Sequence, residues 1–184
     1  GERTFISTRG AETRAPARAW ADFTATMRPG DVLYIDGYLM DHPANRQAAQ
    51  AALEALPEGV QVILDVSPVI GIPQGLPARD VIVSMNHREA QQIINQSAER
   101  ALEQGQELSR GQSQWCGQAR EASAVASLVA SLLGRPVVVR AGAEGAYFAR
   151  PAAVSAEVPA AASANAADVT YIPTPRVAAI DTNG

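Results

Sequence analysis

Short apolar segments alternate with amphipathic segments along this 184-residue chain, and the alternation limits the folds open to it. Apolar runs of strand length stand between stretches whose apolar residues have helical spacing. The pattern predicts strands at 31–35, 60–66, 80–85 and 136–140, and helices at 15–27, 45–56, from about residue 88, and at 119–133. Nearly continuous apolar strands separated by helices are typical of a parallel sheet covered on both faces. The sequence therefore predicts an α/β fold with a mostly parallel sheet flanked by helices.

In the C-terminal part of the chain, a predicted hairpin replaces the alternation of strands and helices. Gly142 and Gly145 bracket a tight turn after the strand at 136–140, and a strand at 145–149 follows at once. A glycine turn between two strands reverses the chain direction, so we expect the sheet to become antiparallel here. Further extended pieces are predicted at 3–8, 169–172 and 177–180.

The charge balance excludes several functions. The formal net charge is -4, and all 15 basic residues are arginine. Because no basic run occurs, we do not expect binding to nucleic acid through phosphate neutralisation. Because lysine is absent, the chain has neither a Schiff-base amine nor the lysine of a P-loop. Any nucleotide chemistry must therefore use another phosphate cradle.

The lengths of the apolar stretches and the cysteine content indicate the cellular compartment. No apolar stretch approaches ~20 residues, so we expect no membrane span. The single cysteine, Cys116, cannot form a disulfide within the chain. His42 and His87 fit no metal-ligand spacing, and His42 is expected to cap or pack in its loop. These features favour a cytoplasmic protein without a zinc site.

Asn86 and Glu89 stand where the predicted strand at 80–85 ends and a helix begins. In open α/β sheets, ligands bind beyond the carboxyl ends of the strands. An amide and a carboxylate at this spacing share one face of the first helical turn and can hold a hydrated Mg²⁺ beside a phosphate. The spacing is also that of a capping box, with Asn86 as N-cap and Glu89 as its reciprocal partner. On spacing alone, the cap is the favoured interpretation.

The turn between Gly142 and Gly145 also allows two interpretations. Glycines leave backbone N–H groups without side-chain cover, which suits the oxygens of a phosphate. An ordinary glycine hairpin explains the same residues, and for this turn taken alone it is the favoured interpretation.

Three motifs, taken in order, resemble the ribokinase or PfkB family of carbohydrate kinases. In that family an N-x-x-E motif follows a core strand, a later strand leads into a G-x-x-G hairpin, and the signature D-T-x-G-A-G-D comes next. Asn86 and Glu89 match the first motif, and Gly142 and Gly145 match the second. Residues 181–184, Asp-Thr-Asn-Gly, match the first half of the third. The resemblance covers nearly the whole chain and implies a three-layer ribokinase-like fold.

The resemblance also implies a nucleotide site with a metal ion. Asn86 would organise the phosphates and Glu89 the water molecules around Mg²⁺. Gly142 and Gly145 would approach the nucleotide. Arg140 stands where the family often has a small hydroxyl residue, and its side chain could still reach a phosphate.

The ends of the chain carry the remaining implied roles. Gly184 would begin the anion hole for the transferred phosphoryl group, and the catalytic aspartate would fall three residues beyond the end of the chain. Asp181 and Asn183 resemble the segment that holds a monovalent cation in several members of the family. Arg9 and Gly10 are the residues expected to face the sugar.

These inferences predict an ATP- and Mg²⁺-dependent kinase that phosphorylates a hydroxyl group of a sugar or nucleoside. We expect 1–184 to be one partial domain of a larger protein, with a lid-side strand in 1–12 and a nucleotide-side core in 13–184. The chain alone is expected to be inactive. The sequence does not decide whether the full-length protein forms a homodimer. The alternative function is a non-catalytic α/β module for nucleotide binding or protein interaction.

Overall fold

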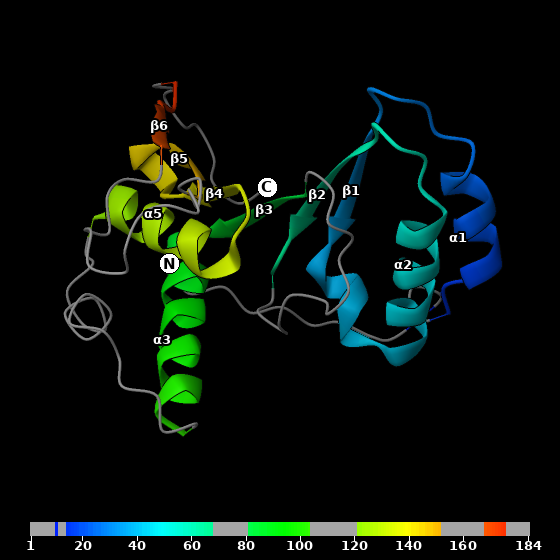
Figure 1. The fold of residues 1–184 in the computed structure, drawn as a ribbon, viewed down its shortest axis with the longest axis horizontal. Coiled ribbons are helices and arrows are strands. Elements are labelled where there is room, and N and C mark those ends of the chain that lie inside the picture. Colours follow the sequence, from blue (N-terminus) through cyan, green and yellow to red (C-terminus); the bar gives the residue numbers. More distant parts are fainter. Residues whose placement is uncertain (1–9, 11–13, 68–80, 104–120, 152–167, 176–184) are drawn as a thin grey trace, which may run out of the picture. The chain divides into compact units, whose positions relative to one another are not determined.

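The computed structural model describes residues 10, 14–67, 81–103, 121–151 and 168–175 (Figure 1). The chain forms two compact units, Gly1–Val83 and Ser84–Gly184. The predicted extended pieces at 3–8 and 177–180 lie outside the described residues. In the part that is described, no helix has the length and apolar character needed to cross a membrane.

The α/β fold expected from the sequence is confirmed. Six strands follow one another in the sheet in their chain order, in a mostly parallel arrangement that ends in an antiparallel hairpin. The strands are β1 (Val32–Asp36), β2 (Gln61–Asp65), β3 (Val81–Asn86), β4 (Val137–Arg140), β5 (Ala146–Arg150) and β6 (Asp168–Ile172). The helices are α1 (Ala17–Thr24), α2 (Pro43–Ala55), α3 (His87–Glu103) and α5 (Ala122–Leu133), with short 3-10 turns η2 (Gly37–Asp41) and η3 (Gly142–Glu144).

The first unit packs two helices beside a parallel strand pair. Strands β1 and β2 run parallel with Val32 opposite Gln61, and α1 and α2 lie side by side (Figure 1). Helix α2 begins where the His42 Nδ1 atom accepts a hydrogen bond from the Ala44 N–H at 3.3 Å. His42 thus has the capping role expected from its sequence context, and Pro43 is at the first helical position, where its missing N–H has no cost.

Helix α1 is shorter than the predicted 15–27. After Thr24 the N–H groups of Thr26 and Met27 donate to carbonyls three residues back, at Phe23 and Thr24. This tighter pattern ends the α-helix before the turn at Gly30, whose φ is +93°. The other boundaries agree with the predicted segments to within a few residues, whereas the 3-10 turn η2 has no counterpart in the sequence-based prediction.

Thr24 joins α1 to α2 through a buried hydroxyl. It is 2% exposed, and its Oγ1 lies 2.8 Å from the carbonyl oxygen of Ala52. We expect Thr24→Val to lower the free energy of unfolding by about 1 kcal/mol, because the buried carbonyl loses a donor. Thr26→Val is the matched control: its hydroxyl also bonds a helix carbonyl but is exposed, so the cost should stay within about 0.5 kcal/mol. Urea denaturation measures both, and equal costs would contradict the role assigned to Thr24.

The second unit contains the hairpin and the helices that cover it. Strand β5 is antiparallel to both neighbours, with Ala146 opposite Arg140 on β4 and opposite Ile172 on β6. Along β4, Val137 and Val139 are fully buried whereas Val138 and Arg140 are half-buried. This alternation is that of a strand with one covered face, and it places Arg140 on the face opposite to Val139.

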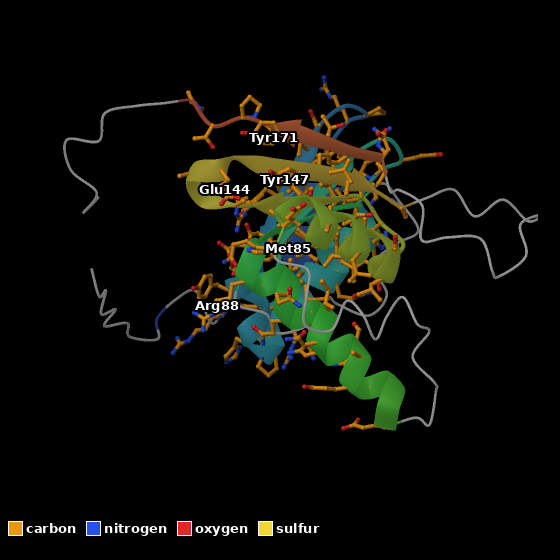
Figure 2. All side chains as sticks on the ribbon, turned by 90° about the vertical axis from the view of Figure 1, so that its left-hand side faces the viewer. Met85, Arg88, Glu144, Tyr147 and Tyr171 are labelled. Carbon is orange, nitrogen blue, oxygen red and sulfur yellow. The ribbon has the colours of Figure 1, made fainter. Side chains whose placement is uncertain are left out.

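An aromatic pair stabilises the outer strands of this unit. Tyr147 and Tyr171 are direct partners across β5 and β6, and their ring centroids are 5.3 Å apart at an interplanar angle of 42°. Figure 2 shows the two rings near one another, with Glu144 at the adjoining turn. Tilted aromatic pairs at this separation add to the stability gained by burying their area.

Candidate functional site

Asn86 and Glu89 form a reciprocal cap at the junction of β3 and α3. The Glu89 N–H donates to Asn86 Oδ1 at 2.9 Å, and the Asn86 N–H donates to Glu89 Oε2 at 2.7 Å. The capping-box interpretation is therefore confirmed. The same bonds fix an amide and a carboxylate at the carboxyl end of a strand and at the positive end of the α3 dipole, where anions are stabilised.

Arg140 brings a positive charge from β4 to this pair. Its Nη1 donates to the Ser84 hydroxyl at 2.7 Å, and its Nη2 lies 4.0 Å from Glu89 Oε2. Ser84 itself is 8% exposed. We call Ser84, Asn86, Glu89 and Arg140 the β3 cluster. All four belong to the second unit.

Sequence reasoning identified three members of the β3 cluster and missed Ser84. Asn86 and Glu89 were identifiable from their spacing, and Arg140 from its place before the glycine turn. Ser84 is a small polar residue inside an apolar strand, which is a weak signal because a buried hydroxyl needs only one partner. Its partner is 56 residues away in the sequence, so no local pattern links the two.

The turn at 142–145 holds two glycines in different surroundings. Both have positive φ, +60° at Gly142 and +99° at Gly145. A Cβ at Gly142 would meet no atom within 4 Å, whereas one at Gly145 would collide with the Ile172 carbonyl oxygen. Gly145 is thus needed for the close approach of β6, and Gly142 leaves open space beside the backbone.

The turn uses several of its own amides. The N–H groups of Ala141, Glu144 and Gly145 donate to carbonyls within residues 141–145. These three donors are therefore committed to the hairpin, and a phosphate oxygen cannot take them without breaking the turn. A ligand at this turn would approach the open side at Gly142.

Comparison with known proteins decides the family. A model of the "pfkB family carbohydrate kinase" matches residues 1–184. The chain belongs to the pfkB family. This confirms the resemblance carried by the Asn86, Glu89, Gly142 and Gly145 motifs.

Other comparisons are less informative about this pfkB chain. A solved structure titled "Crystal Structure of Sa239" matches with 22% sequence identity and a TM-score of 0.44. The match covers 90% of this chain and 42% of that one, so the chain spans less than half the length of the protein it matches. Among curated proteins, none matches the chain.

The donors of the β3 cluster fit a magnesium–nucleotide complex better than a bare metal site. Within the described ranges, no group of three or more His, Cys, Asp and Glu side chains gathers as a metal cage. Mg²⁺ needs no such cage, because it keeps several waters and combines one or two carboxylates with substrate phosphates. Glu89 is the carboxylate, with a side chain 14% exposed, and Asn86 adds an amide oxygen.

The structure does not test the other residues implied by the pfkB resemblance. Arg9, Asp181, Asn183 and Gly184 lie outside the described residues. Gly10 is exposed and belongs to the first unit. Their assignments remain predictions.

Proposed function

We propose that the protein of which these residues are part is an ATP-dependent kinase that phosphorylates a hydroxyl group of a sugar or nucleoside. The observation that carries this proposal is the β3 cluster, where a carboxylate, an amide and a guanidinium meet at the start of α3. Membership of the pfkB family supports the same reaction class.

Each member of the cluster has a role in this proposal. Glu89 would hold waters of a Mg²⁺ ion, and Asn86 would orient the phosphates through its amide. Arg140 and the positive end of α3 would attract the triphosphate, since both place positive charge where phosphate oxygens carry negative charge. The metal, when bound, would neutralise charge between the phosphates during transfer. Gly142 and Gly145 would stand beside the nucleotide.

The residues proposed for the acceptor side of the reaction are assigned from the sequence alone. We propose that Gly184 begins the anion hole, that Asp181 and Asn183 hold a monovalent cation, and that Arg9 and Gly10 face the sugar. Stabilising the charge on the transferred phosphoryl group requires donors that are already in position, which glycine amides provide. A cytoplasmic location and a homodimer of the full-length protein complete the proposal.

A second function is supported by the hydrogen bonds themselves. The reciprocal cap pairs the side chains of Asn86 and Glu89 with backbone N–H groups without any ligand. A non-catalytic α/β module that binds nucleotide or a partner would keep the same cap for stability alone. The two functions differ in whether phosphoryl transfer occurs.

Coupled assays of ADP release distinguish the two functions. We expect the full-length protein to turn over at least one member of a panel of sugars and nucleosides at about 1–100 per second. ATP binding without turnover by the full-length protein, over the whole panel, would contradict the kinase and favour the module.

A further inference from the structure

The Glu89 carboxylate already faces a cation that belongs to the protein. Arg140 Nη2 is 4.0 Å from Glu89 Oε2, the same oxygen that accepts the Asn86 N–H. A divalent ion that approaches Glu89 therefore meets a fixed positive charge beside its ligand.

The two charged groups are anchored independently. Glu89 is oriented by the Asn86 N–H at 2.7 Å, and Arg140 is held by the Ser84 hydroxyl at 2.7 Å. Removing the charge of Arg140 should thus leave the carboxylate in place, which separates an electrostatic effect from a loss of geometry. Ser84 is buried, so its hydroxyl restricts where the guanidinium can move.

The sign of the electrostatic effect depends on the ligand. A guanidinium repels a free divalent cation and attracts the phosphates of a nucleotide. It therefore weakens the binding of the free cation and strengthens the binding of the nucleotide. The Arg140 side chain is 42% exposed, and solvent screening keeps the effect moderate.

We propose that Arg140 is a built-in counter-ion that keeps Glu89 from taking a free divalent cation, so that the metal enters together with the nucleotide. Arg140 is in this sense a positioning residue, because it acts through Glu89. The inference rests on the proposed nucleotide site, and it adds an order of binding that the kinase reaction alone does not require.

Binding of Mn²⁺ without nucleotide tests this inference. Electron paramagnetic resonance counts free Mn²⁺ in solutions of the full-length protein, and we expect Arg140→Gln to lower the Mn²⁺ dissociation constant roughly three- to tenfold. Arg140→Lys keeps the charge and should stay within about twofold of the unmodified protein. Arg150→Gln is the control. It removes an equal charge from the end of β5, where Arg150 is opposite Asp168 of β6, and it should leave the Mn²⁺ dissociation constant unchanged.

A folding control and a second variant accompany the Mn²⁺ measurement. Melting temperatures without metal show whether each variant is folded, and a purely structural role for Arg140 would lower them without tightening Mn²⁺. If Arg140→Gln does not fold, Ser84→Ala replaces it, since it removes the hydroxyl to which the guanidinium donates. We expect Ser84→Ala to shift the constant in the same direction by a smaller factor.

The outcomes separate this inference from the proposed function. A folded Arg140→Gln or Ser84→Ala with an unchanged or higher Mn²⁺ constant would overturn the counter-ion role, while ADP binding by the unmodified protein would leave the proposed function standing. An unmodified protein that does not bind ADP, with or without Mn²⁺, would overturn both, because the inference rests on the nucleotide site.

Discussion

Gly145→Ala is expected to lower the free energy of unfolding by about 2–5 kcal/mol, the sum of two costs. An L-residue is strained at φ +99°, and its Cβ would collide with the carbonyl oxygen of Ile172 on β6. The ring of Tyr171, 3.1 Å from the same Cβ position, leaves no room to shift sideways. Strand β6 would have to move away from β5, which breaks their pairing.

Gly142→Ala is the matched control for this effect. It makes the same change in the same turn, also at positive φ, but the new Cβ would enter open space. Its cost should be about 1–2 kcal/mol, from backbone strain alone. Urea denaturation of both variants gives the comparison, and equal losses would show that the packing against β6 contributes nothing.

The difference between these glycines could not be predicted from the sequence. Both fit the G-x-x-G spacing, and both need positive φ. What distinguishes them is a carbonyl of Ile172, which lies far along the chain and reaches Gly145 only because β6 pairs with β5. Long-range pairing of this kind is set by the whole sheet and not by a local pattern.

Local patterns, by contrast, predicted the strands and the cap well. The predicted apolar runs became β1 to β4. Strand β3, with four of its six residues buried, fits the rule that a strand covered on both faces has continuous apolar side chains, whereas β1 buries only Ile35. The Asn86 and Glu89 spacing predicted both reciprocal bonds, since a capping box involves only neighbouring residues. The link from Arg140 to Ser84 and Glu89 needed the adjacency of distant strands, so the sequence indicated the arginine but not its partners.

Glu89→Gln is expected to lower the rate of phosphoryl transfer by the full-length protein about 10- to 100-fold at fixed ATP, and to raise the Mg²⁺ requirement. A neutral amide holds the waters of a metal ion less strongly than a carboxylate does. The cap should survive, because glutamine also serves at this position of a capping box. The melting temperature should therefore change little while the kinetics change greatly.

Glu99→Gln is the control for this substitution. It removes the same charge from an exposed position on the same helix, α3, and should alter neither rate nor Mg²⁺ dependence. Initial rates over a range of Mg²⁺ concentrations, with melting curves of both variants, separate the ligand role from the cap. If Glu89→Gln retains the rate of the unmodified protein at limiting Mg²⁺, Glu89 and Asn86 serve α3 as a cap and the metal is held elsewhere. A large fall in melting temperature together with the rate would instead show that the ion pair with Arg140 supports the fold, because glutamine keeps the cap but loses the charge that faces Arg140.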